Sequence, residues 1–387
     1  MTPSFFSAPH SGSAVHALVI GVGGYPYLAG GEKAAASAEA DFPGMGQLTS
    51  PPRSALAFAR RFTDGCGRWD VPLGSVDLLV SVRTGDPFPE ASGLVLPTAT
   101  IDDIRTAFEA WLARCSQHDD NIAVLYFCGH GLQSESQVLL ASDFNRFSSS
   151  PFAQAFDFDV TRLALQQRGP RSQCIVIDAC RTDCLDQGPV RALPLAQPEP
   201  FDPLKCENEL ILRPPPFLEA TGPHGDVSHL TRALLRALDG QAATTDDDGA
   251  WVIRTAGVHQ AIDLLLREEL GVLSLAGGVD AHSRGDTLLL RLEAAPVTRL
   301  TVNCRPAEEA SRSTLSCVPA YPPDLPGVEC GLPRHSKGDD GRAPSQEWRM
   351  ELQAGYYLLS AQSETAKGSL LKRVDPPHSR AILQVMP

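Results

Sequence analysis

The sequence predicts an α/β fold with a doubly wound, mostly parallel sheet flanked by helices and followed by a small all-β C-terminal domain. Short apolar runs rich in β-branched residues, typical of strands buried on both faces, occur at His16–Gly24, Ser75–Val82, Ile122–Cys128 and Cys174–Ile177. Amphipathic helical segments separate these runs, and such alternation is typical of a parallel sheet. From about Val297, short strand-like segments recur between Pro, Gly and charged turns instead.

The helices are predicted from apolar side chains at helical spacing. We expect them at Arg53–Asp64, Thr100–Cys115, Asp159–Gln167, Val227–Leu238 and Val258–Leu270. In the most regular of them, Thr100 and Asp103 resemble a capping box, with Asp in place of Glu or Gln. A hairpin is expected through Gln137–Phe144 and a short strand through Phe217–Thr221. The C-terminal strands are expected at Arg299–Cys304, Ser313–Val318, Glu347–Leu352, Tyr356–Gln362 and Ile382–Val385.

Composition narrows the function classes. The 387 residues carry a formal net charge of −13, which is unfavourable for binding nucleic acid. No apolar run approaches the length of a membrane span, and Met1–Ser13 lacks the basic residues of a signal peptide. The ten cysteines form no CxxC pair with zinc-site spacing. We therefore expect a cytoplasmic protein with reduced thiols, no cofactor and no metal.

Two chemically reactive side chains directly follow buried strands. Cys180 lies at the end of the CIVIDACR stretch, and His130 follows IAVLYFC within FCGHG. If the two strands are parallel neighbours, both residues meet at the carboxyl edge of the sheet, where ligands bind in open α/β folds. A nearby imidazole can convert a thiol into a thiolate nucleophile. The sequence thus predicts a Cys–His nucleophilic site.

Each residue alone has a simpler explanation. A lone cysteine at a strand end is usually a small core residue, and a lone histidine is usually a hydrogen-bonded polar group. The pair is more specific, because both follow apolar strands, both have small neighbours, and 50 positions separate them. In caspases the histidine lies about 50 residues upstream of a Gln-Ala-Cys-x-Gly motif.

The FCGHG and IDACR blocks resemble those of the family of cysteine peptidases that contains caspases and metacaspases. The resemblance covers roughly residues 14 to 290. Asp178 stands in place of the caspase Gln and Thr182 in place of the Gly, which resembles the metacaspase and bacterial caspase-like branch. Many family members carry Asn-Asp-Ala where this chain has Arg53-Ser54-Ala55.

The resemblance implies a caspase-like fold and a mechanism. Cys180 would attack a peptide carbonyl, and His130 would act as the base and then protonate the leaving amine. The backbone N–H groups of Cys180 and Gly131 would bind the oxyanion. The family generally acts through such a dyad. By analogy with metacaspases, Asp178 would bind an Arg or Lys of the substrate.

The resemblance also implies a domain organisation. We expect an N-terminal arm at 1–13, a peptidase domain at 14–290 and an all-β accessory domain at 297–387. Within the peptidase domain, a large-subunit-like part (14–183) and a small-subunit-like part (217–290) flank a proline-rich linker at 184–216. Arg191 and Lys205 are candidate self-cleavage sites there.

The function that follows is a cysteine endopeptidase that cleaves proteins after a basic residue. By family resemblance it would be self-processing and regulatory, in defence or cell-death signalling. The expected partners are a protein or peptide substrate and a regulatory protein bound through residues 297–387, with neither nucleic acid nor membrane. The alternative is a catalytically inactive caspase-like scaffold that acts through its C-terminal β domain.

Overall fold

The computed structural model describes most of the chain, and its residues form two compact units. The described residues are 5–64, 68–88, 96–183, 191–215, 221–222, 226–271, 279–330, 334–335 and 346–386. The first unit comprises Met1–Gly65, Trp69–Leu235 and Ile262–Leu289. The second comprises Cys66–Arg68, Arg236–Ala261 and Leu290–Pro387. Each unit is described separately below.

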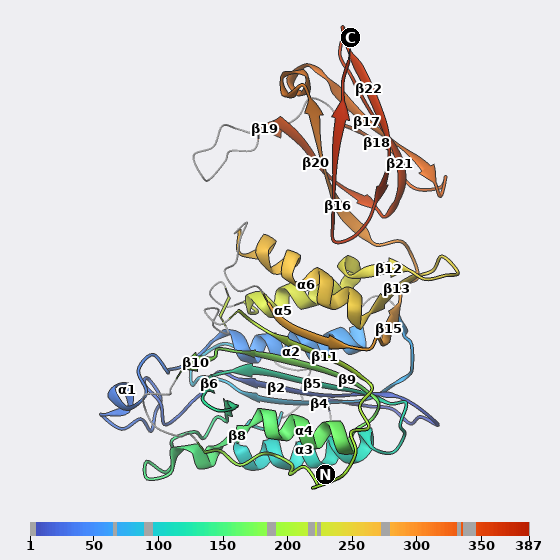
Figure 1. Cartoon of the computed structure of the whole chain (residues 1–387). Helices are drawn as coiled ribbons and strands as arrows, with labels where there is room; N and C mark the ends of the chain where they lie inside the picture. Colours follow the sequence, from blue (N-terminus) through green and yellow to red (C-terminus); the bar gives the residue numbers. More distant parts are fainter. Residues whose placement is uncertain are drawn as a thin grey trace. The chain divides into compact units, whose positions relative to one another are not determined.

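A seven-stranded sheet forms the centre of the first unit (Figure 1). Its order is β1 (Phe6–Ser7), β4 (Leu73–Ser81), β2 (Val15–Val22), β5 (Ile122–Gly129), β9 (Ser172–Ala179), β11 (Asn208–Arg213) and β14 (Asp280–Arg284). All neighbours from β4 to β11 pair in parallel, whereas β1 and β14 pair antiparallel at the two edges. The prediction of a mostly parallel, doubly wound sheet is confirmed.

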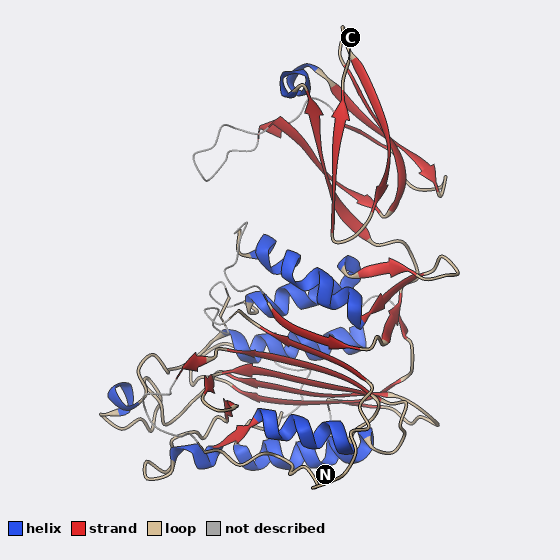
Figure 2. Ribbon diagram, in the orientation of Figure 1, coloured by secondary structure: helices blue, strands red, loops and turns tan. Residues whose placement is uncertain are grey.

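Helices cover both faces of this sheet (Figure 2). On one face lie α2 (Ser50–Asp64) and α5 (His229–Arg236), and on the other lie α3 (Ile101–Cys115) and α4 (Phe158–Arg168). The predicted cap of α3 is present, because Thr100 Oγ1 accepts a hydrogen bond from Asp103 N at 3.3 Å. The remaining helices are α1 (Ala38–Asp41) and α6 (Thr255–Glu269), with 3₁₀ turns at Pro151–Gln154 and Ala307–Arg312 and a π-helical turn at Ala237–Gln241.

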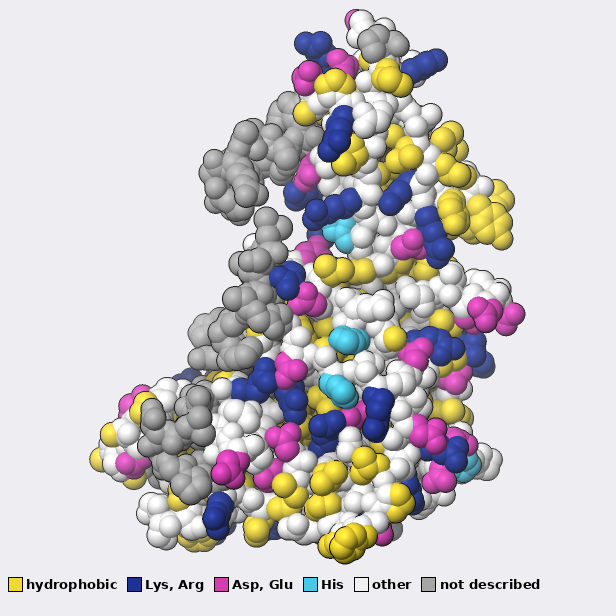
Figure 3. Space-filling view, in the orientation of Figure 1, with side chains coloured by type: hydrophobic (Ala, Val, Ile, Leu, Met, Phe, Trp, Pro, Cys, Tyr) yellow, Lys and Arg dark blue, Asp and Glu magenta, His cyan; other side chains and the backbone are white. Residues whose placement is uncertain are grey.

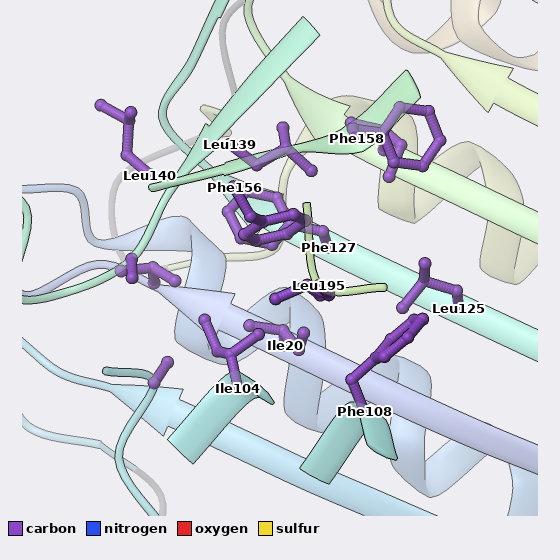
Figure 4. Close-up of a cluster of buried hydrophobic side chains, with 14 of the residues drawn as sticks. Ile20, Ile104, Phe108, Leu125, Phe127, Leu139, Leu140, Phe156, Phe158 and Leu195 are labelled. Atoms are coloured by element: carbon purple, nitrogen blue, oxygen red, sulfur yellow. The ribbon is translucent and has the colours of Figure 1, made fainter. Parts of the chain in front are cut away.

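The main hydrophobic core lies between the sheet and the α3–α4 layer (Figure 4). Alternate residues of β5, Leu125 and Phe127, point into it and meet Phe108 of α3 and Phe158 of α4. These side chains are fully or almost fully buried, and each contributes roughly 1.5–3 kcal/mol through its removal from water. The core thereby holds β5 and β9 rigidly up to their last residues.

Four further short strands and a linker segment lie at the carboxyl edge of the sheet. β10 (Thr182–Asp183), β6 (Gly131–Gln133), β7 (Gln137–Leu140) and β8 (Ala155–Asp157) form a small sheet in that order. Residues 191–206, which we call the strap, run along α4. Leu195 is buried and its backbone N–H donates to Thr161 Oγ1 at 3.0 Å.

The second unit contains a β-sandwich, which confirms the predicted all-β C-terminal module. One sheet has the order β19 (Arg334–His335), β20 (Gln346–Gln353), β16 (Val297–Arg305) and β23 (His378–Gln384); the other has β18 (Val328–Cys330), β17 (Thr314–Tyr321), β21 (Gly355–Gln362) and β22 (Lys367–Val374). Leu300, Trp348 and Tyr357 lie in its core. A further small sheet has the order β12 (Ala243–Thr245), β13 (Trp251–Arg254), β15 (Leu288–Arg291) and β3 (Arg68–Trp69).

Some segments differ from the expectation. The predicted linker 184–216 ends too late, because Asn208–Arg213 forms β11 inside the sheet. The apolar run of β11 has only Leu210, Ile211 and Leu212 between charged residues and nearby prolines, so its signal is weak. β14 and β22 were not predicted either. Within the predicted arm 1–13, Phe6–Ser7 pairs with β4. The predicted strand Phe217–Thr221 lies largely outside the described residues.

No helix in the described part of the chain has both the length and the apolar character needed to cross a membrane.

Candidate active site

His130 and Cys180 lie next to each other at the carboxyl edge of the central sheet. β5 and β9 pair in parallel up to Gly129 and Ala179, and β6 and β10 resume parallel pairing at Leu132 and Thr182. The offset is 50 positions on both sides, so the same register sets His130 opposite Cys180. Neighbouring strands are about 4.8 Å apart. The two positions therefore meet as the sequence predicted, while their catalytic roles remain a prediction.

Two groups hold the His130 imidazole in place. Tyr25 packs against the ring at 4.8 Å between centroids, and its hydroxyl accepts a hydrogen bond from the backbone N–H of His130 at 2.9 Å. On the ring itself, Nε2 lies 2.9 Å from the carbonyl oxygen of Gly46. Because a carbonyl only accepts, Nε2 carries the hydrogen, and Nδ1 has the free lone pair in the neutral ring.

Burial keeps this imidazole uncharged. His130 is 5% exposed, and desolvation lowers its pKa, while the hydrogen bond to Gly46 acts in the opposite direction. An uncharged imidazole at neutral pH is competent to accept a proton. Cys180, in contrast, is partly exposed at the surface of the sheet edge and forms no disulfide. The arrangement combines a buried base with an accessible thiol.

Gly131 allows the backbone after His130 to pass very close to the backbone of Cys180. A β-carbon at this position would lie 2.7 Å from the carbonyl oxygen of Cys180 and 3.1 Å from the Cβ atom of Ala179. The glycine thus lets the segment that carries Cys180 approach the backbone after His130. Any larger residue would separate these two segments.

Asp178 is completely enclosed on the α2–α5 face of β9. It is 1% exposed, and its Oδ2 accepts hydrogen bonds from the hydroxyls of Ser228 and Thr231, the latter at 2.7 Å. Among the described residues, Oδ1 has no hydrogen-bond partner although it is buried. Burial raises the pKa of this carboxyl, and the two hydroxyls oppose that rise. The Cys128 thiol, a weak donor, also opposes the rise, and no N–H or O–H group of the described residues donates to Oδ1.

Polar groups from two more elements, β5 and α2, surround Asp178. Cys128 is its register partner on β5, and burial raises the pKa of the Cys128 thiol. Tyr126 Oη lies 2.6 Å from Thr231 Oγ1. Ser54 of α2, which stands where many family members carry an aspartate, accepts a hydrogen bond from Ser228 N at 2.9 Å. The chain therefore has a hydroxyl at this position rather than a second carboxylate.

Arg181 anchors the segment that follows the thiol. Its Nη1 lies 2.6 Å from Asp280 Oδ2 on β14, and Arg213 approaches the same oxygen at 3.7 Å. Arg213 in turn contacts Asp159 at 3.2 Å. This chain of ion pairs connects the nucleophile segment with β11, β14 and α4.

The two candidate cleavage sites differ in their surroundings. Both Arg191 and Lys205 are exposed, at opposite ends of the strap. The peptide N–H groups of Lys205 and Cys206 donate to Gln166 O at 2.9 and 3.0 Å, so the Lys205–Cys206 bond is fixed to α4. Arg191 precedes the packing of Ala192 against the main core and the backbone pairing of Leu193 with Phe156.

The site also contains residues that the sequence analysis did not identify. The carbonyl of Gly46 has no sequence signature, because every residue carries one. Tyr25 and Gln47 are 22 positions apart, and Ser228 and Thr231 approach Asp178 only in the folded chain. Among the described residues, no cluster of His, Cys, Asp and Glu side chains suits a metal ion.

Comparison with known proteins identifies the family. A family model described as a caspase domain, Peptidase C14, matches residues 15–265. The chain belongs to the caspase-domain family of peptidases. This match includes the His130 and Cys180 segments, so the site described above lies within the caspase domain. The residues after 265 that the structure describes, including the β-sandwich, lie outside the match.

Individual relatives are distant. The uncharacterized protein y4kE of Sinorhizobium fredii (strain NBRC 101917 / NGR234) is 28% identical over 230 residues, which are 56% of this chain and 63% of that protein. Protein GSU0716 of Geobacter sulfurreducens matches 70% of this chain and 94% of its own, with 14% identity and a TM-score of 0.41. The structure named pro-sf-caspase-1 matches 70% and 87%, with 12% identity and a TM-score of 0.35.

Proposed function

We propose that this protein is a cysteine endopeptidase with Cys180 as nucleophile and His130 as base. The observation that carries the proposal is the shared register of 50 positions, which sets a partly exposed thiol beside a buried imidazole. Membership of the caspase-domain family supports the same chemistry.

The reaction would follow from the geometry of His130. With Nε2–H engaged by Gly46 O, Nδ1 would take the proton of the Cys180 thiol and return it to the leaving amine. The thiolate would add to the substrate carbonyl and form an acyl-enzyme, which water would then hydrolyse. The backbone N–H groups of Gly131 and Cys180, on closely packed segments, would stabilise the oxyanion.

We further propose that substrates are cut after Arg or Lys, through Asp178. The surroundings of Oδ1 support this, because a buried carboxylate oxygen that no N–H or O–H group reaches is costly unless a ligand supplies a donor. Residues 216–220 and 223–225, which precede α5 in the sequence, lie outside the described residues. The preference therefore rests on Asp178 itself.

Labelling by an electrophilic peptide probe tests the proposal. Peptides with Arg, Lys, Leu or Asp before an acyloxymethyl ketone should be compared on wild type, Cys180→Ala and His130→Ala. We expect labelling of Cys180 by the Arg and Lys probes, its absence in Cys180→Ala and a strong reduction in His130→Ala. Wild-type protein that no probe labels would contradict the peptidase proposal. Labelling that does not favour Arg and Lys would reject only the specificity.

A scaffold function is the second candidate, and one observation favours a binding role for the sandwich. Val318, Leu358 and Leu371 form one register row across β17, β21 and β22, and all three are exposed. Hydrophobic side chains gather over these strands in Figure 3. Binding of a partner protein that persists in Cys180→Ala but is lost in Leu358→Lys would support this function. A cytoplasmic setting and a role in defence or cell-death signalling stay predictions from the resemblance.

A further inference from the structure

The two groups that hold His130 come from separate segments of one long loop. Tyr25 contacts the ring and the backbone of His130, and Gly46 accepts from the ring nitrogen. Twenty-one positions separate Tyr25 from Gly46, and α1 is the only helix between them. A flexible connection of this length does not by itself keep two contacts in register.

The side chain of Gln47 joins these segments. Its Oε1 accepts a hydrogen bond from Tyr25 N at 2.9 Å, and its Nε2 donates to Tyr25 O at 2.8 Å and to Ala29 O at 3.2 Å. The amide thus satisfies both backbone groups of Tyr25 at once. Because Gln47 directly follows Gly46, these bonds also fix the Gly46 carbonyl. Leu48 N donates to Gly23 O at 2.9 Å and supports the same alignment.

We propose that Gln47 is a positioning residue for the peptidase reaction. Its side-chain amide holds Tyr25 and the Gly46 carbonyl in register, so that both contact His130 and its Nδ1 is directed to the thiol. The inference deepens the proposed function and rests on it, since it assigns no new reaction. Gln47 touches neither His130 nor Cys180 in any contact of the described structure and acts only through its neighbours.

The consequence for the thiol follows from hydrogen bonding. A carbonyl acceptor stabilises an imidazolium more than a neutral imidazole, and so it favours transfer of the Cys180 proton to His130. If Gly46 moves away, the ion pair forms less readily and the thiol behaves more like an ordinary cysteine. The titratable groups around Tyr25 and His130 are the Tyr25 phenol and the thiols of Cys128 and Cys180. Among the described residues, burial and the hydrogen bond to Gly46 are the causes of the shift in the pKa of His130.

Two substitutions separate the roles of the amide. Gln47→Met keeps the length of the side chain and removes all three hydrogen bonds. Gln47→Glu keeps the acceptor for Tyr25 N but sets a carboxylate against the carbonyls of Tyr25 and Ala29. Gln167→Met is a matched control: Gln167 also accepts from one backbone N–H, that of Glu199 at 2.8 Å, and donates to two carbonyls, those of Glu199 and Asp202, at 3.0 and 2.9 Å. These bonds join α4 to the strap, and Gln167 forms no hydrogen bond with the segments that hold His130.

The experiment measures the rate of Cys180 alkylation by iodoacetamide between pH 5 and 9 in the full-length protein, by mass mapping of the Cys180 peptide. In wild type, the alkylation rate of Cys180 should reach half of its maximum at a lower pH than the rate of an ordinary thiol does. His130→Ala should lose this reactivity at low pH. We expect Gln47→Met to react at least about 10-fold more slowly than wild type near pH 6.5, the lower end of the effect of one hydrogen bond to a charged group, and to recover at high pH. Gln47→Glu should be slowed in the same way as Gln47→Met, and the alkylation rate of Gln167→Met should equal that of wild type.

The outcomes are separable. A His130→Ala profile identical to that of wild type would refute the Cys–His site itself and thus the proposed function. A His130-dependent wild-type profile that Gln47→Met and Gln47→Glu leave unchanged would overturn the role of Gln47 alone. A slower reaction in Gln167→Met equal to that in Gln47→Met would show a general loss of stability and would also overturn it. Peptide turnover should fall in kcat rather than rise in KM, because the hydrogen bonds of Gln47 position the base through Tyr25 and Gly46.

Discussion

At the scale of single residues, the site depends on its reactive groups and equally on two quieter features. One is a glycine without a side chain, and the other is an imidazole without a charge. Gly131 provides the close approach of two backbones, and His130 remains neutral because it is buried. Asp178 is enclosed by hydroxyls, which stabilise its charge less than an arginine would. Each of these features predicts the effect of one substitution.

Gly131→Ala should abolish catalysis with little unfolding. The added methyl group would lie 2.7 Å from the Cys180 carbonyl, so the segment carrying the thiol or the one carrying the imidazole must shift. A misplacement of about 1 Å in a reacting group can cost about 100-fold in rate. We expect at least that loss in kcat/KM on a fluorogenic peptide, with circular dichroism unchanged. Gly129→Ala is unsuitable as a control, because its methyl group would meet Tyr25 Oη. Gly327→Ala serves instead, because it lies in the β-sandwich and its methyl group would come no closer than 3.3 Å to a neighbouring atom. Turnover of Gly131→Ala within a few-fold of wild type would contradict the close contact.

Asp178 should make the preference for basic peptides depend on pH. Burial raises its pKa, so the carboxyl takes up a proton at a higher pH than an ordinary aspartate does. Protonation removes the attraction for an Arg or Lys side chain. The ratio of kcat/KM for Arg over Leu peptides should therefore fall as the pH falls, and in Asp178→Asn it should be low and independent of pH. A wild-type ratio that does not change with pH would argue against Asp178 as the specificity residue.

At the scale of elements, the strap separates the two candidate cleavage sites. It is bound to α4 through Leu195, Glu199, Lys205 and Cys206, and Gln166 and Gln167 supply most of its partners. Proteases bind substrates as extended strands whose backbone groups are free to pair with the enzyme. A bond whose own N–H is engaged with a helix is poorly available for cleavage.

Self-processing, if the proposed peptidase performs it, should occur after Arg191 and not after Lys205. Arg191→Gln should leave the chain intact, and Lys205→Gln should be processed like wild type. Intact-mass spectrometry with Cys180→Ala as the uncleaved reference distinguishes these results. Cleavage after Lys205 in wild type would show that the strap detaches from α4 before it is cut. After cleavage at Arg191 the strap should remain bound to α4, so the fragments should elute together in gel filtration.

The elements themselves differ in how well the sequence predicts them. The helix Thr100–Cys115 and the strands around Ile122–Cys128 and Cys174–Ile177 have regular patterns, because they pack on the main core over their whole length. β11 and β14 were missed since their apolar content is low. Asp280–Arg284 is an edge strand with partly exposed side chains, and its pairing with β11 rather than its composition makes it a strand.

At the scale of the whole molecule, the two ends of the parallel strands have different chemistry. The dyad lies beyond the carboxyl ends, whereas His16 is buried near the amino end of β2, where its Nδ1 lies 2.9 Å from Ser75 Oγ. Burial, with His10 and Arg114 nearby, lowers the pKa of His16 to about 4. His16 is thus a determinant of stability that is independent of the active site.

The first unit should lose stability in acid because of His16. Its pKa is about 6.5 when unfolded and about 4 when folded, so the unfolded chain binds more protons between these values. The contribution of His16 to the free energy of unfolding is complete above pH 6.5. It is lost as the pH falls towards 4, by up to about 3 kcal/mol. Urea unfolding followed through Trp111, which donates to His16 O, should show this loss. Asp178 acts in the opposite direction, since its raised pKa favours the folded state at low pH.

The free energy of unfolding of His16→Asn should depend less on pH than that of wild type between about pH 4 and 6.5. His118→Asn, at an exposed histidine, should show the pH dependence of wild type. Parallel pH dependence of wild type and His16→Asn would assign the acid sensitivity to other groups.

The fold class, the family resemblance and the candidate Cys–His pair could be predicted from the sequence alone. They follow from local patterns: apolar runs that end in FCGHG and IDACR, with a separation of 50 that parallel pairing converts into proximity. How the imidazole is held is visible only in the folded chain, because Gly46 acts through a backbone carbonyl and Gln47 through hydrogen bonds to a segment 22 positions away. The same is true of the enclosure of Asp178 and of the binding of the strap to α4. Such contacts depend on which distant segments the folded core brings together, and local sequence patterns do not predict these pairings.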